Sequence, residues 1–279
     1  MPVISSNYAA DSALNFLNRN AGTEAGQLSR LASGSRIVEA SDDASGLAIG
    51  TQLTAQASVF SQDSSNIEQA VAILQTADGA MAQISNVLQR MMALATEAAS
   101  GQVTDIQRSQ DINTEYFQLK TELSSIVNST SYAGQKLLTG SFMSNVKFLV
   151  GTSSANFITV SVATISIALS GAGGLLGSGS TVSTAASGLV AMNAVTSAIN
   201  TVVEDRARIG GYEFQFDFSN SNIGSNVQNT DASASVMLDA DVAVVKSQLA
   251  ATDVLTKAAV AALTQASTLP KDLLKLLQA

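Results

Sequence analysis

The sequence predicts a mainly α-helical protein, a long antiparallel helical coiled-coil bundle built from both chain ends, with a small β-hairpin element in the middle. Apolar residues recur every seven positions in both terminal stretches, residues 1–140 and 188–279, as in helices that pack along their length. Between these stretches the chain is rich in Gly, Ser and Thr and carries no charge from Phe148 to Val203. The two prolines, Pro2 and Pro270, leave the helical stretches between them uninterrupted.

The repeats define helices in both halves. We expect helices over residues 5–31, 43–100 and 105–128, a fourth along the repeat from Val195 to Met237, and a fifth over residues 240–265. A short turn should start at Pro270. Side-chain acceptors at residues 41–43 suit the start of the second helix, and Ser100-Gly101 suits its end. Glycines 210, 211 and 224 weaken the fourth helix and are expected to permit close approach of a neighbouring backbone. The repeats are Leu53, Phe60, Ile67, Leu74, Met81, Leu88 and Ala95 in the first half, and Val195, Val202, Ile209, Phe216, Ile223, Thr230 and Met237 in the second.

The middle of the chain has a different pattern. Residues 147–150 and 157–167 alternate apolar and hydroxyl side chains around a short Gly/Ser/Thr loop, which predicts a β-hairpin. The uncharged segment 158–177 is long enough to be considered as a membrane-spanning helix. Its apolar side chains alternate with period two and it contains several glycines, which favours a strand, so no membrane insertion is expected. Residues 170–188 are Gly/Ser-rich and are predicted to form a surface connection.

Composition excludes several function classes. The net charge is −8 and no basic run exists, so nucleic acid is not an expected partner. With neither histidine nor cysteine, the chain offers no Ser–His triad and no His- or Cys-ligated metal site. The acidic pair in Asp239-Ala240-Asp241 stands at a predicted helix start, where capping explains it. We therefore predict neither an enzyme nor a cofactor.

Several segments together resemble bacterial flagellin. No single motif is decisive, but their order and spacing are specific, and the likeness covers about residues 1–165 and 190–279. Val236 stands where the family usually has an arginine, and the Asn-rich C-terminal ending of the family is altered. The segments are LSRLASGSRI (28–37), ASDDASGLAI (40–49), ILQTADGA (73–80), YAGQKLL (132–138), the strand pair around 151, LDAD (238–241) and the ending ASTLPKDLL (266–274).

The resemblance implies a division into domains. Residues 1–41 and 240–279 would form an inner terminal coiled coil, and 42–169 with 189–239 a long helical bundle that carries the hairpin. Only the connection 170–188 is left for the outer variable domains of many flagellins, so these domains are predicted to be absent.

The resemblance also suggests contact residues. Polymer contacts are expected at the charges of the junction between the two domains and at leucines of the terminal seams: Arg30, Arg36, Asp42, Asp43, Leu14, Leu17, Leu28, Leu249 and Leu263. The alternative for the charges is a capped helix end in solvent. A segment with Gln89, Arg90 and Leu94, together with Glu115, is similar to the part of some flagellins that innate immune receptors recognise. An ordinary subunit-packing surface is the favoured interpretation.

The predicted function is that of a structural subunit that self-assembles through its terminal helices into the extracellular flagellar filament for motility. The resemblance implies as partners a flagellar type III export apparatus, an export chaperone, the filament cap and hook-junction proteins. The alternatives are a hook-filament junction protein, a signalling coiled-coil protein, which would need a tight helical hairpin tip, and a secreted adhesin, which the low aromatic content disfavours.

Overall fold

The computed structural model describes residues 7–139, 145–151, 156–161 and 181–277, with side chains up to residue 268. It confirms the mainly α-helical fold with a small antiparallel strand pair in the middle of the chain. The helices are α1 (Tyr8–Ser33), α2 (Ala44–Ala99), α3 (Asp105–Gln107), the π-helix η1 (Arg108–Ile112), α4 (Asn113–Ser129), α6 (Ala185–Leu238) and α7 (Val242–Leu277). The strands are β1 (Ser131–Tyr132), β2 (Gln135–Lys136), β3 (Val146–Leu149) and β4 (Phe157–Val160).

The chain folds as two compact units. The terminal unit comprises Met1–Ala57 and Gln228–Ala279, and the central unit comprises Ser58–Val227. The domain division expected from the sequence stays a prediction. Most of the predicted connection, residues 170–180, lies outside the described residues.

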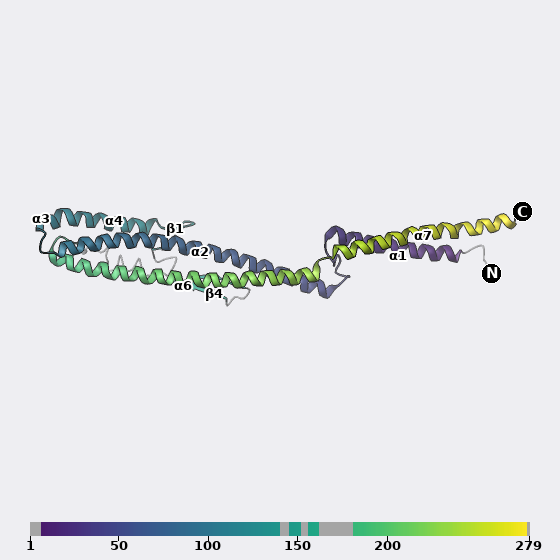
Figure 1. The fold of residues 1–279 in the computed structure, drawn as a ribbon, viewed down its shortest axis with the longest axis horizontal. Helices are drawn as coiled ribbons and strands as arrows, with labels where there is room; N and C mark the ends of the chain where they lie inside the picture. The colour runs from purple at the N-terminus through teal and green to yellow at the C-terminus, as the bar shows by residue number, and fades with distance from the viewer. Residues whose placement is uncertain (1–6, 140–144, 152–155, 162–180, 278–279) are drawn as a thin grey trace. The chain divides into compact units, whose positions relative to one another are not determined.

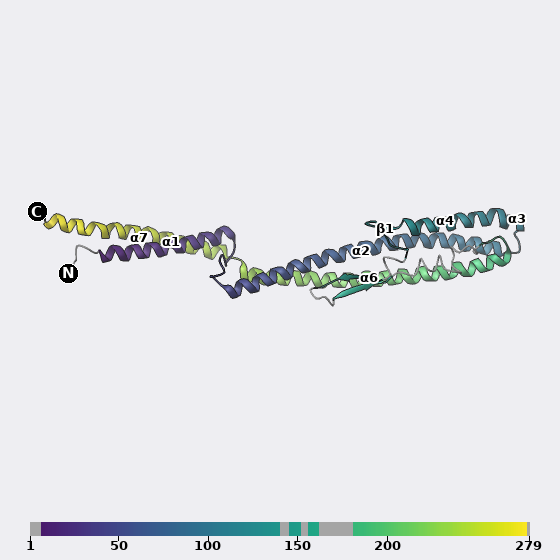
Figure 2. The same ribbon diagram turned by 180° about the vertical axis from the view of Figure 1, so that it is seen from behind.

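The core of the central unit lies along the seam predicted by the seven-residue repeats. In both views of this unit, α4 and α6 run alongside α2 (Figures 1 and 2). The central positions of the α2 repeat, from Ile67 to Ala95, are buried. They form one hydrophobic cluster with the α6 repeat from Val195 to Ile223 and with Tyr116 and Leu123 of α4. Burial of both repeats confirms that the pattern specifies helix packing.

The β-hairpin packs on α6. Strands β3 and β4 pair antiparallel, with Val146 opposite Val160 and Leu149 opposite Phe157. The Phe148 ring meets the Phe216 ring edge to face, with centroids 5.6 Å apart. The predicted strands are confirmed in these residues, and the predicted extension over 162–167 lies outside the described residues.

A second hairpin joins β1 and β2, with Ser131 opposite Lys136 and Tyr132 opposite Gln135. Its two central residues have positive φ, 48° at Ala133 and 81° at Gly134. Two successive positive values match a type I′ turn, which fits the twist of paired strands. This hairpin was not among the sequence predictions.

The prediction that the last helix ends before Pro270 is wrong, because α7 continues through Pro270 to Leu277. A proline inside a helix removes one backbone donor, that for the carbonyl four residues earlier. Here that carbonyl is Ala266 O, which accepts a hydrogen bond from Asn7 Nδ2 at 2.7 Å. A side chain near the start of α1 therefore replaces the backbone hydrogen bond that Pro270 removes from α7.

The prediction of close backbone approach at glycines 210, 211 and 224 is also wrong within the chain. A Cβ added at any of the three would meet no atom within 4 Å. The close approach occurs at Gly188 instead, where an added Cβ would lie 2.9 Å from Ala99 N. The start of α6 thus sits directly against the last turn of α2.

By length and composition, one described helix could cross a bilayer, namely α6. Only 28% of its most apolar window is buried. A single helix of this kind is weak evidence for a membrane span, because the core helices of other proteins pass the same test.

Candidate functional site: the terminal helices and their junction

Helices α1 and α7 pack against each other within the terminal unit. This terminal pair, as we call α1 and α7 together, has a thin interior. No residue of α1 is buried. The buried residues of the described part of α7 are Val245, Thr252, Ala259 and Ala266, spaced by seven. Small side chains in a two-helix pair bury little apolar surface, so the pair gains little hydrophobic stabilisation from its own seam.

Polar side chains occupy the middle of this seam. Thr256 Oγ1 donates to Glu24 Oε2 at 3.1 Å, and Thr252 Oγ1 lies 3.5 Å from Gln27 Oε1. Such contacts orient the two helices but contribute only modest free energy. The terminal pair is therefore ordered by specific polar contacts more than by hydrophobic burial.

Large apolar side chains of the terminal pair face outward. On α1, Tyr8 is 87% exposed and Phe16 is 56% exposed, and on α7 Val254 is 64% exposed. Exposed apolar side chains gathered on one helix pair are a candidate interaction surface. The others are Leu14 and Leu28 on α1, and Val242, Val244, Leu255 and Val260 on α7.

The leucines predicted as polymer contacts divide into two groups. Leu14 and Leu28 are among the exposed residues, whereas Leu17, Leu249 and Leu263 are half-buried. The exposed pair is free to meet another molecule, and the half-buried three lie nearer the seam. Their role in polymer contacts stays a prediction.

At the junction, residues 34–36 run beside residues 237–240, with Ser35 bridged to Asp239. Gly34 adopts the left-handed conformation, with φ of 71°, and ends α1. Its carbonyl accepts from Ala240 N at 2.9 Å, and Arg36 N donates to Leu238 O at 2.6 Å. The predicted capping by the acidic pair is confirmed for Asp241, whose Oδ1 accepts from Ala243 N and Val244 N at the start of α7.

The four charged residues predicted for this junction all have partners within the chain. Arg30 lies 3.6 Å from Asp42, and Arg36 lies 3.4 Å from Asp43. Arg36 also donates twice to Met237 O, from Nε at 3.0 Å and from its terminal nitrogen at 2.7 Å. Their further role between subunits stays a prediction.

The two aspartates of this group act as backbone caps. Asp42 Oδ2 accepts from Val38 N and Glu39 N, and these two hydrogen bonds, with Arg30 nearby, lower the pKa of the Asp42 carboxyl. Asp43 Oδ1 accepts from Gly46 N at 2.8 Å at the start of α2. Capping fixes the direction in which the chain enters α2.

The segment that resembles a receptor-recognition site is only partly at the surface. Arg90 and Glu115 are exposed and form an ion pair at 2.6 Å between α2 and α4. Gln89 is exposed, but Leu94 is 2% exposed and belongs to the core. Receptor recognition stays a prediction, and Leu94 could contribute to it only indirectly.

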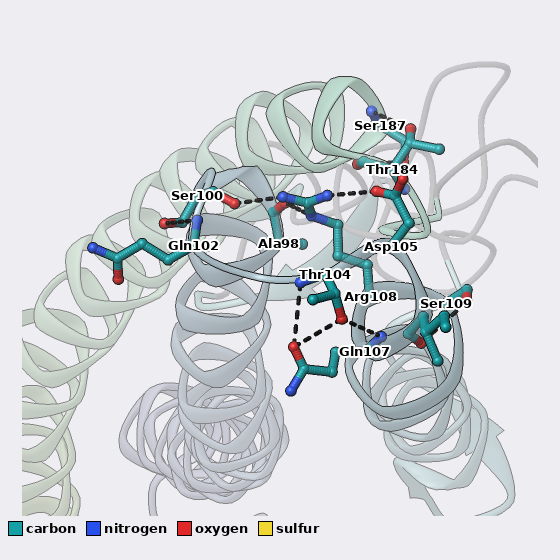
Figure 3. A network of polar contacts seen from close by, with 11 residues as sticks. Ala98, Ser100, Gln102, Thr104, Asp105, Gln107, Arg108, Ser109, Thr184 and Ser187 are labelled. Carbon is teal, nitrogen blue, oxygen red and sulfur yellow. Dashed lines mark hydrogen bonds and ion pairs between the residues drawn. The ribbon is translucent and has the colours of Figure 1, made fainter.

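Sequence reasoning did not identify Arg108, which is 7% exposed and closes one end of the central unit. Figure 3 shows its guanidinium between the end of α2 and the start of α3. Nε donates to Ala98 O at 2.8 Å, one terminal nitrogen donates to Ser100 O at 2.6 Å, and the other meets Asp105 at 2.6 Å. The last turn of an α-helix leaves its carbonyls without intrahelical donors, and Arg108 supplies two.

The π-helix η1, which begins at Arg108, interrupts the single helix predicted over 105–128. No composition signal distinguishes such a turn from ordinary helix, so sequence reasoning did not foresee it. The capping box beside it is readable from the sequence, because Thr104 and Gln107 bond reciprocally three residues apart.

A buried carboxylate interrupts the α2 seam at Asp63. This residue is 2% exposed, and its Oδ2 has no hydrogen-bond partner among the described residues. Burial raises the pKa of the Asp63 carboxyl. The sequence marks this position, because Asp63 interrupts a second run of positions spaced by seven that is apolar at all but two of its members. These members are Ile49, Gln56, Asp63, Ala70, Ala77, Ile84 and Met91.

A depression of about 500 Å³ lies between α6 and three residues next to β3 and β4, namely Val150, Gly151 and Asn156. Amide side chains and two phenylalanines line it, and the described residues contain no group of three or more His, Cys, Asp or Glu that could hold a metal ion. The lining offers hydrogen bonds but neither a nucleophile with a base nor a charge cluster, so it provides no catalytic arrangement.

A chain that closes one long helical seam internally, and leaves apolar residues of its terminal helix pair uncovered, belongs to the class of helical assembly subunits. Comparison with known families specifies the class. Residues 4–143 match the bacterial flagellin N-terminal helical region, and residues 192–277 match the bacterial flagellin C-terminal helical region. The chain belongs to the bacterial flagellin family, a family of structural proteins.

Individual relatives agree with this assignment. The flagellar filament 30.7 kDa core protein of Treponema maltophilum is 30% identical over 99% of this chain and 99% of its own. Flagellin of Listeria monocytogenes is 33% identical over 89% of this chain and 90% of its own. Flagellin of Bacillus subtilis is 29% identical over 99% of both chains. The protein is a structural subunit of the flagellar filament and assembles with copies of itself.

Solved structures support the fold. A protein described as a flagellar hook-associated protein from Vibrio parahaemolyticus superposes with a TM-score of 0.59 over 70% of this chain and 99% of its own. Because the two sequences are only 18% identical, this likeness establishes the architecture and does not favour a junction role.

Proposed function

We propose that the terminal pair α1–α7 is the element through which this subunit polymerises. The observation that carries the proposal is that the terminal pair buries few side chains between its helices and exposes large apolar side chains on its outer surface. No α1 residue is buried, yet Phe16 and Leu28 of the same helix are each 56% exposed. In a filament these side chains would be covered by the terminal pairs of neighbouring subunits, and burying a side chain of this size is worth about 1.5–3 kcal/mol.

The weak interior also suits passage through an export channel. A helix pair that buries only Val245, Thr252, Ala259 and Ala266 gains little from pairing in isolation, and isolated helices are marginal in water. We propose that the terminal segments travel unfolded and order when neighbours cover them. A chain without cysteine forms no disulfide crosslinks on that route.

The proposed location is the extracellular filament, reached through a flagellar type III export apparatus with the help of an export chaperone. The filament cap and the hook-junction proteins are the proposed neighbours at the two ends of the polymer. The role is mechanical assembly for motility rather than catalysis.

Seeded polymerisation of the purified full-length protein tests the proposal. Phe16→Gln removes an exposed apolar contact without touching the internal seam. We expect the critical concentration for filament growth to rise at least about tenfold, because the lost burial exceeds about 1.4 kcal/mol. Thermal unfolding of the same protein as a monomer should stay unchanged.

The matched control is Asn18→Gln, an exposed position of the same helix that carries no apolar group. It should polymerise like the wild type. If Phe16→Gln filaments grow at the wild-type critical concentration, the terminal pair is not the assembling surface.

A further inference from the structure

The side chain of Asn7 makes two hydrogen bonds that join the beginning and the end of the described chain. Its Oδ1 accepts from Ala10 N at 3.1 Å, which caps the start of α1. Its Nδ2 donates to Ala266 O at 2.7 Å, on α7. A carboxamide suits this arrangement because it carries an acceptor and a donor on one planar group.

The carbonyl that Asn7 reaches is a particular one. In an α-helix, Ala266 O would accept from the backbone nitrogen of residue 270, and that residue is Pro270, which has no N–H. Ala266 is 8% exposed, so solvent reaches this carbonyl poorly. The donor missing from α7 is thus supplied by the N-terminal segment.

The opposite end of the terminal pair is held by the junction, where Ala240 N donates to Gly34 O at 2.9 Å. The two attachment points at the caps of α1, Asn7 and Gly34, are 27 positions apart. Their partners, Ala240 just before α7 and Ala266 within it, are 26 positions apart. The matched spans place the two bonds at opposite ends of one paired stretch. Between them the buried positions of α7 are Val245, Thr252 and Ala259, so the paired stretch buries little apolar surface of its own.

From this arrangement we infer that Asn7 is a positioning residue for assembly. Its side chain holds the start of α1 against α7 by supplying the hydrogen-bond donor that Pro270 lacks, and we call this contact the latch. The two chain ends then order together, because the last turns of α7 depend on a residue of the first seven. The inference rests on the proposed role of the terminal pair in polymerisation.

A double-mutant cycle in full-length protein separates this role from simple capping. Asn7→Asp keeps the capping oxygens and removes the donor, and Pro270→Ala returns a backbone N–H to Ala266 O. With Pro270 present, Asn7→Asp should raise the critical concentration for filament growth about tenfold, as expected when a buried acceptor loses its partner. Combined with Pro270→Ala, the same substitution should change it less than about twofold, because the helix then supplies its own donor.

The matched charge control is Asn18→Asp, an exposed position on α1, which should leave the critical concentration unchanged in both backgrounds. Equal losses from Asn7→Asp in the wild-type and Pro270→Ala backgrounds would overturn the latch, and so would no loss in either. Wild-type filaments grow in the same assay, so either result would leave the proposed role of the terminal pair intact.

A distance measurement supplies a readout that lost stability alone would not move. Because the chain has no cysteine, spin labels can be placed on cysteines introduced at two exposed positions by Ala9→Cys and Ser267→Cys, in filaments diluted with unlabelled subunits. We expect one narrow distance distribution that Asn7→Asp broadens. Labels placed by Ser29→Cys and Ser247→Cys, nearer the junction, should keep their distribution. Broadening at both pairs, or at neither, would overturn the latch.

Discussion

Seven-residue repeats of apolar side chains build both the α2–α6 seam of the central unit and the terminal pair. The apolar side chains are buried in the first region and largely exposed in the second. In the central unit, Leu74, Met81 and Leu88 are fully buried between α2 and its neighbours. In the terminal pair, Leu14 and Leu28 of the corresponding kind of repeat are about half exposed. A third helix and a hairpin cover the first seam, whereas among the described residues α1 and α7 cover only each other. The repeat therefore predicts which face of a helix is apolar. Whether that face is buried depends on how many other elements of the chain pack against it.

The comparison assigns different tasks to the two regions. A seam closed within the chain gives each subunit its own stability. If the terminal pair polymerises as proposed, it gains most of its stability when neighbours cover it, so folding of the ends and growth of the filament become one event. Substitutions that separate monomer stability from assembly can break or sharpen this contrast.

The largest expected effect comes from Leu88→Ala in the central seam. Leu88 is fully buried, and removal of such a side chain costs about 2–5 kcal/mol. Thermal unfolding of the monomer by circular dichroism measures the loss. The matched substitution Leu28→Ala, at a 56% exposed position, should cost the monomer less than about 0.5 kcal/mol. Similar losses for the two would abolish the distinction between the regions.

Arg108→Met comes next, because it removes both donors to the end of α2. Leaving buried carbonyls such as Ala98 O without partners costs about 2 kcal/mol. Hydrogen exchange should increase at the last turn of α2 and stay unchanged in α1. Uniform increases along the whole chain would mean that Arg108 does not act locally on the helix end.

Asp63→Asn should stabilise the central unit at neutral pH by about 1 kcal/mol, since a buried charge is replaced by a neutral group. The folded pKa of Asp63 is raised, so the folded state binds this proton more tightly than the unfolded state. The stability contribution of the carboxyl is then fully present below pH 3.8, the ordinary pKa, and is lost as pH rises through the folded pKa.

Denaturant unfolding of wild type and Asp63→Asn, followed from acidic to neutral pH, checks this sign. The advantage of the variant should be full at neutral pH and shrink as the pH falls through the folded pKa. An advantage independent of pH would show that charge is not its cause.

The smallest effect is expected for Arg206→Gln. Arg206 forms a bidentate pair with Asp78 between α6 and α2, at 2.7 and 3.1 Å, but both side chains are about a third or more exposed. Such a pair contributes less than about 1 kcal/mol and weakens with salt. Unfolding in low and high salt should show a small difference between variant and wild type that disappears at high salt. A loss above about 2 kcal/mol would place this pair among the main supports of the seam.

Much of the central unit could be predicted from sequence, because its repeats are long and free of breakers. Ile67, Leu74 and Met81 were expected on one seam and lie there. The α2 boundaries were also predictable, since Asp43 and Ser100-Gly101 carry ordinary start and stop signals. Burial of Leu14 and Leu28 could not be judged, because periodicity does not reveal what covers a face.

The features that escaped prediction depend on contacts distant in sequence. Pro270 was expected to lie beyond the end of the last helix, but it lies within α7. The hydrogen bond from Asn7 to Ala266 O replaces the one that Pro270 cannot donate. Arg108 drew no prediction, and it lies at the start of a π-turn where its side chain reaches the carbonyl of Ala98 in α2. For both residues, a contact with another segment of the chain determines the observed conformation, and the local sequence does not reveal that contact.

The contact at Gly188 has a consequence for the length of the polypeptide between the two halves. An added Cβ there would meet backbone atoms of Ala98 and Ala99, so the place where the chain returns to the bundle is fixed by the end of α2. Because this contact involves only residues of α2 and α6, a change in the length of sequence between the two halves is expected to leave that return point unchanged. For a flexible insertion, the cost of loop closure grows only with the logarithm of its length. The same bundle can therefore carry guest sequences of very different size, whereas enlarging one residue, Gly188, would force the two helices apart.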